Sequence, residues 1–236
     1  MSGNYVIAGG SKGIGRELVR LLEPNADQID VYSRSQDELN VNEVVRHHAC
    51  DFTLDEIQLE ELPEVIHGVA YCPGSINLRS FRSLKPDDFR KDLEVNLIGA
   101  VKFLQACQTG LKKGGAESPS SAVLFSTVAV GQGLPMHASV ASAKGAIEGL
   151  TRSLASEWAP KIRVNCLAPA LTETPLAARF FSSPESREAM AAKYPLGRTG
   201  VPHDLASIAQ FLLTPQSSWI TGQVIGVDGG MSSLRS

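Results

Sequence analysis

Thr127, Val140 and Lys144 lie in the part of the sequence whose residue types and spacing point most directly to chemistry. Val140 and Lys144 are four residues apart, so on a helix their side chains share one face. Thr127 follows a short apolar run, residues 122–126, which predicts a β-strand that ends at this threonine. The sequence therefore predicts a hydroxyl group and an ammonium group that face one small volume, with a valine beside the ammonium.

Two further residues could act on the same volume. His137 precedes Val140 by three residues and lies near the same helix face if the helix has begun there. Its ordinary pKa of about 6.5 suits proton transfer at neutral pH, although it could also line a pocket without transferring a proton. Asn96 lies in a segment of helical period, residues 86–111, where asparagine is an unfavourable choice. Its apolar neighbours predict a buried asparagine rather than a surface one.

A glycine-rich turn near the start of the chain is the second chemical feature. An apolar run, residues 5–8, leads into this turn, and a segment of helical period follows. Glycines let the backbone approach a pyrophosphate, and the N–H groups of a helix N-terminus carry partial positive charge. A tight structural turn would look the same, whereas a phosphate loop of a nucleotide triphosphatase is disfavoured because Lys12 precedes the last glycines. The dinucleotide interpretation assigns cofactor contacts to Gly9, Ser11, Lys12, Gly13, Ile14 and Gly15.

The end of the second expected strand, residues 29–32, bears on the choice of cofactor. An acidic residue there would hold the ribose 2′-hydroxyl of NAD(H). This chain has Ser33 and Arg34 instead, and with Lys12 they could meet a 2′-phosphate. NADP(H) is therefore preferred over NAD(H), the alternative being that Arg34 and Lys12 are solvated surface charges.

The order of these motifs resembles the short-chain dehydrogenase/reductase family over essentially the full chain. The turn matches the family's G-x-x-x-G-x-G spacing, and Lys144 matches the active-site lysine that holds the nicotinamide ribose. Thr127 stands at the position of a serine that binds the carbonyl oxygen. Asn96 matches an asparagine that forms a hydrogen bond with the backbone at a local distortion of the helix. Val140 stands where the family has its proton-donating tyrosine. The resemblance implies hydride transfer between NADP(H) and a carbonyl or secondary alcohol, similar to the family's 3-oxoacyl reductases.

The resemblance also implies cofactor contacts elsewhere in the chain. Asp51 matches an aspartate that contacts the adenine amino group, although it could equally cap a helix over residues 54–62. Gly74 is all that remains of the family's Asn-Asn-Ala-Gly motif, and Cys72 takes the place of a polar residue there. The segment implied to clasp the nicotinamide carboxamide contributes Pro169, Thr172 and Thr174.

Strand and helix patterns alternate along the chain, which predicts an α/β fold: one Rossmann-type, doubly wound parallel sheet of seven strands flanked by helices. One NADP(H)-binding domain, residues 1–236, accounts for the whole sequence. Residues 172–196 should form two short helices that act as a substrate lid, from which Tyr194 could reach towards the site. The expected strands are residues 5–8, 29–32, 44–49, 67–71, 122–126 and 161–168, and a last strand with its turn at 222–230.

Composition limits the partners. A net charge of −3 and a pI near 6.0 offer no polyanion-binding face, so nucleic acid is not expected. The four cysteines form no C-x-x-C pair, which indicates reduced thiols in a cytoplasmic protein and no zinc site. His47 and His48 are adjacent on a strand, face opposite sides, and are interpreted as structural rather than metal ligands. No apolar stretch predicts a membrane span. The resemblance implies a homotetramer or homodimer.

Two function classes follow from the valine. The first is an oxidoreductase with atypical proton donation, since loss of a general acid costs roughly 10²- to 10⁴-fold and leaves weak hydride transfer possible. The second is a catalytically impaired NADP(H)-binding protein, a sensor or a partner subunit. The glycine turn, Asn96, Thr127 and Lys144 together favour the first, because a protein that only binds nucleotide has less need of Asn96 and Thr127.

Overall fold

Seven parallel strands form one sheet in the order β3-β2-β1-β4-β5-β6-β7. This is a computed structural model, and it describes residues 3–54, 56–57, 59 and 61–234. The chain runs outwards from β1 to β3 and then returns to β4 on the other side of β1, so strand order reverses there. The predicted doubly wound fold is confirmed. The strands are β1 (Asn4–Ala8), β2 (Gln28–Ser33), β3 (Val45–Ala49), β4 (Gly68–Tyr71), β5 (Ser120–Phe125), β6 (Ile162–Pro169) and β7 (Val224–Val227).

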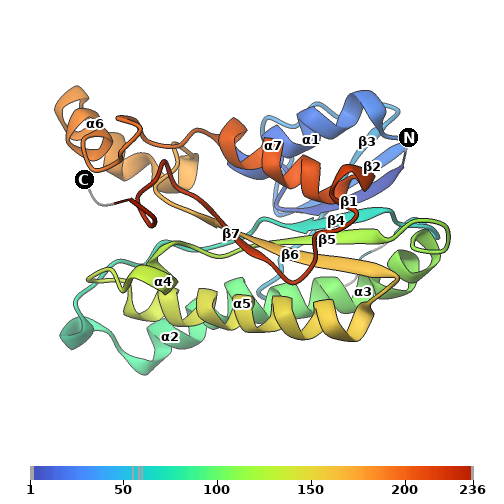
Figure 1. Ribbon diagram of the computed structural model, residues 1–236, viewed down its shortest axis with the longest axis horizontal. Helices are drawn as coiled ribbons and strands as arrows, with labels where there is room; N and C mark the ends of the chain where they lie inside the picture. The colour runs from blue at the N-terminus through green and yellow to red at the C-terminus, as the bar shows by residue number, and fades with distance from the viewer. Residues whose placement is uncertain (1–2, 55, 58, 60, 235–236) are drawn as a thin grey trace.

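Helices cover both faces of the sheet, as Figure 1 shows. On one face α1 (Gly13–Leu22) packs beside α7 (Pro202–Leu213). On the other face lie α2 (Pro86–Leu93), α3 (Gly99–Gly114) and α5 (Ala138–Trp158). The shorter elements are α4 (Ala129–Gln132), α6 (Pro184–Ala191), a π-helical turn η3 (Glu94–Ile98), and the 3-10 helices η1 (Glu23–Asn25), η2 (Phe81–Ser83), η4 (Pro175–Phe181) and η5 (Pro215–Ser217).

Each face of the sheet has its own hydrophobic core, because the central strands are buried on both sides. Under α1 and α7 the helix side chains that pack on the sheet include Leu18 and Leu205, both with no exposed surface. Under α3 and α5 they include Phe103 and Ile147, which are equally buried. Burying a side chain of this size stabilises the fold by roughly 1.5–3 kcal/mol. The two cores thus hold the strands in place, and the loops of the site follow the carboxyl ends of these strands.

The segment with the helical period, residues 86–111, is interrupted in its middle. Between α2 and α3 the five residues of η3 adopt a π-helical turn around Asn96. The Asn96 side-chain amide donates to the Asp92 carbonyl oxygen at 2.7 Å, the acceptor that the Asn96 N–H would take in a regular α-helix. The local distortion implied by the resemblance is therefore present, because the Asn96 side chain competes with its own backbone for the Asp92 carbonyl oxygen.

Two other segments frame the site. Between β3 and β4, the described part of residues 54–62 is not helical, and Asp51 instead accepts hydrogen bonds from the N–H and hydroxyl of Thr53 at 2.9 and 2.7 Å. Residues 172–196 contain two short helices, η4 and α6, which extend beyond the sheet in Figure 1. Within the described residues, no helix is long and apolar enough to cross a membrane, and no group of three or more His, Cys, Asp or Glu residues could hold a metal.

Candidate functional site

A pocket of about 440 Å³ opens along the carboxyl ends of β1, β2 and β4. This is the place where strand order reverses, and ligands of open α/β sheets bind in such a crevice. The pocket brings together most of the cofactor residues predicted from the sequence. The predicted residues that line it are Gly9, Ser11, Lys12, Gly13, Ile14, Gly15, Ser33, Arg34, Asp51, Gly74 and Thr174.

The glycines of the turn are required by its geometry. Gly9 and Gly13 have φ of 71° and 53°, a left-handed conformation that side chains disfavour. A Cβ on Gly15 would lie 2.3 Å from the carbonyl oxygen of Gly9, so α1 can approach β1 only without a side chain there. The first turn of α1 has no acidic residue, and its N-cap, Lys12, makes no side-chain cap bond. The N–H groups of this helix end therefore suit an anion.

The end of β2 adds polar and cationic groups to the same pocket. Ser33 and Arg34 line it, and the Ser33 hydroxyl donates to the Ser35 carbonyl at 2.9 Å and lies 3.1 Å from His47 Nε2. His47 therefore contacts a cofactor-site residue, which its expected structural role did not include. Asp37 also lines the pocket, where its carboxylate lies 3.0 Å from Lys12 Nζ.

Lys144 lies at the inner end of the site on α5. Its side chain is only 8% exposed, and Nζ donates to the Phe125 carbonyl oxygen at 2.8 Å. Burial lowers the Lys144 pKa from its ordinary 10.5 to about 8, against the opposing effect of the nearby Cys166, Cys72 and Asp92. Because this pKa stays above 7, the amine keeps its proton at neutral pH.

Gly74 brings Lys144 and Asn96 to the edge of the pocket. A Cβ on Gly74 would lie 3.4 Å from Lys144 Nζ and 3.3 Å from Asn96 Oδ1. Asn96 is fully buried, and its Oδ1 has no hydrogen-bond partner among the described residues. An unpartnered buried acceptor is costly unless a bound group satisfies it, so this atom and the lysine point to a ligand-binding position.

Thr127 follows the end of β5 by two residues, and Val140 lies in the first turns of α5. Thr127 is half-buried just after β5, and its hydroxyl oxygen accepts a hydrogen bond from the Ala129 N–H at 3.3 Å, which leaves the hydroxyl proton free to point elsewhere. Val140 is 6% exposed and stands one helical turn before Lys144, as the spacing predicted. The residue one helical turn before the lysine is therefore apolar and has no proton to donate.

The two candidate proton donors lie at different places. His137 is the N-cap of α5, half-buried, with Nδ1 2.7 Å from the Pro135 carbonyl oxygen. A ring nitrogen at this distance from a carbonyl carries a hydrogen, so Nε2 has a proton to give only when the ring is doubly protonated. Tyr194 is buried near the end of β6, where its hydroxyl accepts from the Leu171 N–H at 3.2 Å.

A buried polar network behind the lysine was missed by sequence reasoning. Asp92, 3% exposed, accepts from the Ser75 hydroxyl at 2.6 Å, and Ser75 in turn accepts from the Asn96 amide at 2.9 Å. The Asn77 amide lies 3.4 Å from the Ser139 hydroxyl, which is 1% exposed. Because the Asn77 amide also lies 3.5 Å from the Asp92 carboxylate, Ser139 belongs to this network. The i, i+4 spacing of Asp92 and Asn96 was the only available signal.

The segment after β6 closes the pocket against the glycine turn. β6 ends at Pro169, Thr172 is buried, and its hydroxyl donates to the Ala170 carbonyl at 3.1 Å. A Cβ on Gly13 would lie 3.3 Å from the Thr174 methyl group, so this segment touches the turn directly. Of the three residues predicted for the nicotinamide end, Thr174 lies in the pocket beside the glycine turn, whereas Pro169 and Thr172 do not line it.

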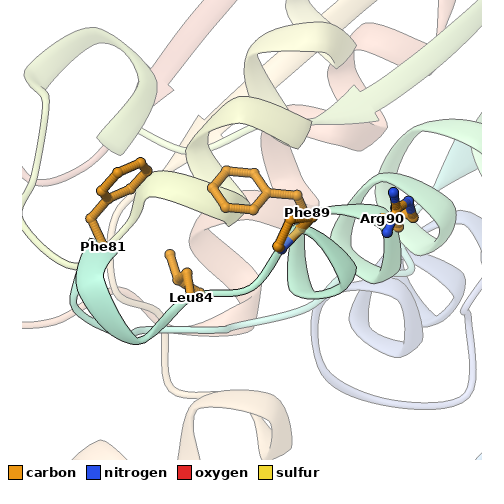
Figure 2. A pocket seen from close by; sticks show the side chains of 5 residues that line it. Phe81, Leu84, Phe89 and Arg90 are labelled. Carbon is orange, nitrogen blue, oxygen red and sulfur yellow. The ribbon is translucent and has the colours of Figure 1, made fainter.

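A second, apolar pocket lies away from these residues. Figure 2 shows Phe81, Leu84 and Phe89 gathered around it. The pocket has a volume of about 400 Å³, is also lined by Pro86 and Arg90, and shares no residue with the pocket at the sheet edge. Of these two pockets, the one at the sheet edge contains a helix N-terminus and cations, and its residue Gly74 adjoins the buried Lys144. Its residues fit a dinucleotide.

Comparisons with known proteins agree with this geometry. A family model described as enoyl-(acyl carrier protein) reductase matches residues 44–232. A tropinone reductase homolog from Arabidopsis thaliana is 33% identical over 246 residues, covering 96% of this chain and 91% of the relative. L-xylulose reductase from Bos taurus is 31% identical over 234 residues, covering 95% and 94%.

Solved structures share the fold over nearly the full chain. ElxO with NADP bound has a TM-score of 0.86 at 24% identity, covering 99% of this chain and 100% of its own. A 3-ketoacyl-(acyl-carrier-protein) reductase from Brucella melitensis complexed with NADH has a TM-score of 0.82 at 24% identity, covering 98% of each chain. The same fold therefore holds either nicotinamide cofactor.

Proposed function

Since the chain belongs to the short-chain dehydrogenase/reductase family, we propose that it is an NADP(H)-dependent oxidoreductase acting on a carbonyl or a secondary alcohol. One observation carries this proposal. The pocket runs from the glycine turn to Gly74, against which both the buried Lys144 Nζ and the unpartnered Oδ1 of Asn96 lie. The cofactor would supply or accept the hydride, and the chain would bind, orient and donate protons.

Each end of the site has its own task in this proposal. The N–H groups at the start of α1 bind the pyrophosphate. The Lys144 ammonium binds the hydroxyls of the nicotinamide ribose, and the free hydroxyl proton of Thr127 binds the substrate oxygen. Residues 172–196 act as a substrate lid, supported by the hydrogen bond at 3.1 Å from Arg179 Nη2 to the Ile76 carbonyl, which joins this segment to the loop after β4.

The preference for NADP(H) over NAD(H) is part of the proposal. Lys12, Ser33 and Arg34 line one end of the pocket, and no acidic side chain occupies the position directly after β2. Two cations and a hydroxyl would stabilise a 2′-phosphate through charge-assisted hydrogen bonds.

Proton donation is atypical in this proposal, because Val140 stands where the family has a tyrosine. Two groups can carry a proton near it: the Lys144 ammonium, whose pKa is about 8, and the doubly protonated ring of His137. Loss of a positioned acid slows the chemical step by roughly 10²- to 10⁴-fold. The enzyme is therefore slow unless one of these groups replaces the tyrosine.

A second function has its own support. Val140 removes a proton donor without disturbing the pocket that would hold the nucleotide, which is the pattern expected of a catalytically impaired NADP(H)-binding protein. In either case we propose that the chain forms a homodimer or homotetramer. The supporting feature is the surface of α5 around Gly149, where nothing lies within 4 Å of an added Cβ and a second helix could approach closely.

Turnover by the wild type and by Val140→Tyr and Val140→Phe tests the proposal. NADPH consumption is followed with a panel of ketones and 3-oxoacyl thioesters. We expect slow consumption by the wild type, a rise of about 10²-fold or more in Val140→Tyr, and no rise in Val140→Phe, which matches the ring without its hydroxyl. Activity in Val140→Tyr alone would favour the impaired binding protein. Absence of consumption in all three would contradict hydride transfer.

A further inference from the structure

Asp37 occupies the part of the pocket where the 2′-phosphate of NADP(H) would bind. Its carboxylate lies 3.0 Å from Lys12 Nζ and 3.3 Å from the Ser11 hydroxyl, and it also accepts from the Ser35 hydroxyl. Lys12 and Ser11 are cofactor residues predicted from the sequence, and Asp37 was not among them. The negative charge at this end of the pocket therefore comes from the protein itself.

The position of Asp37 is well determined by its contacts. The side chain is 23% exposed, compared with 54% for Lys12, and it lines the pocket together with Arg34. Its φ of 47° lies in the left-handed region, which asparagine and aspartate tolerate better than other side chains. Hydrogen bonds from Ser35 and Lys12 lower the pKa of this carboxyl, so it is ionised at neutral pH. Three donors thus hold an anion in a backbone conformation that turns it into the pocket.

We propose that Asp37 is a specificity-determining residue that competes with the 2′-phosphate for Lys12 and Ser11 and so narrows the preference for NADPH over NADH. This inference rests on the proposed cofactor site. A phosphate and a carboxylate cannot share the Lys12 ammonium without repulsion between like charges, so NADPH must displace Asp37 or bind against it. The 2′-hydroxyl of NADH is neutral and can donate a hydrogen bond to the same carboxylate.

The proposal separates the roles of the charged groups around the ribose. Lys12 and Arg34 attract a phosphate, whereas Asp37 offsets one of these two positive charges before any nucleotide arrives. The net charge offered to the phosphate is therefore smaller than the sequence motif suggests. Removing the carboxylate would release Lys12 and Ser11 and leave the glycine turn unchanged.

The test compares Asp37→Asn with the wild type and with Glu38→Gln. Asparagine keeps the size of the side chain and tolerates the left-handed backbone, so the fold should be retained, which a melting curve checks. Glu38→Gln removes the same charge one residue further on, from a side chain that is 70% exposed and pairs with Arg16 outside the pocket. Dissociation constants for NADPH and NADH are measured by fluorescence titration of each protein at one salt concentration.

We expect Asp37→Asn to bind NADPH about tenfold more tightly and NADH no more tightly than the wild type, because one like charge beside the phosphate is removed. Glu38→Gln should change both constants less than about twofold. Unchanged or weaker NADPH binding by Asp37→Asn, with nucleotide still bound by the wild type, would overturn the role of Asp37 alone. Failure of every protein to bind either nucleotide would overturn the proposed cofactor site as well.

Discussion

The two ends of the site differ in what holds them together. At the phosphate end the contacts depend on backbone: positive φ at Gly9 and Gly13, and a helix end that Gly15 allows close to β1. At the proposed reacting end they depend on individual side chains: Thr127 and Lys144 carry polar groups, whereas Val140 has no proton to supply. Backbone contacts tolerate change in the side chains around them, whereas a proton transfer depends on one group. Binding can therefore persist when chemistry is weakened.

The largest effect is expected at the phosphate end, from Gly15→Ala. The added Cβ would meet the Gly9 carbonyl oxygen at 2.3 Å and force α1 away from the turn. NADPH binding should weaken by about 100-fold or more, since the helix N–H groups would no longer converge on the pyrophosphate.

Gly131→Ala, in α4, is the matched control, because nothing lies within 4 Å of its added Cβ. It should bind NADPH like the wild type and unfold at the same or a slightly higher temperature. If Gly15→Ala retained full affinity in a titration, the turn would not hold the nucleotide, and the contrast between the two ends would be lost.

The variant Lys144→Met tests the reacting end through the pH dependence of the unfolding free energy. In the wild type the Lys144 pKa is about 8 in the folded state and 10.5 ordinarily, so between these values the unfolded chain binds the extra proton. The unfolding free energy of the wild type therefore increases as the pH rises from about 8 to 10.5. Below pH 8 the buried charge lowers this free energy by its full amount, about 3 kcal/mol. Methionine removes that cost.

We expect the unfolding free energy of Lys144→Met to exceed that of the wild type at pH 7, with a difference that shrinks by about 3 kcal/mol towards pH 10.5. Urea unfolding at a series of pH values measures it. Lys112→Met, at an exposed position of α3, should show a difference independent of pH over this range. A pH-independent difference for Lys144→Met as well would show that the lysine is not buried with its charge.

His137→Gln is expected to have the smallest effect. Because Nδ1 lies 2.7 Å from the Pro135 carbonyl oxygen, the ring can donate a proton from Nε2 only in its doubly protonated form. The rate of NADPH consumption at pH 8 should change by less than about twofold. A tenfold loss of this rate that grew towards pH 6 would identify His137 as the acid. The reacting end would then contain a proton donor in place of the tyrosine.

Local sequence patterns were sufficient to predict the strands and helices and the site residues that lie on them. The apolar runs predicted the seven strands, and the four-residue spacing of Val140 and Lys144 predicted the helix that carries them, α5. The glycine turn could be found for the same reason, because its requirements concern neighbouring residues. Asn96 was correctly predicted to be buried. The helical period alone gave no sign of the π-helical turn around it.

Residues whose role depends on distant partners could not be predicted. Asp37 meets Ser11 and Lys12 across 26 and 25 residues of sequence, and Asp92 meets Ser75 across 17. No periodic pattern marks such pairs, because loops bring them together only after the sheet has formed. The orientation of His137 was hidden for a similar reason, since the short loop before α5 determines it.

Equilibrium titration of the wild-type protein with NADPH and NADH, followed by nucleotide fluorescence, tests the central claim most directly. The claim is that the phosphate end is intact even though the reacting end lacks its tyrosine. The account predicts saturable binding of both nucleotides, with NADPH the tighter by a modest factor because Asp37 offsets part of the charge of Lys12 and Arg34. Absence of saturable binding by either nucleotide would contradict it, whatever the activity of the protein.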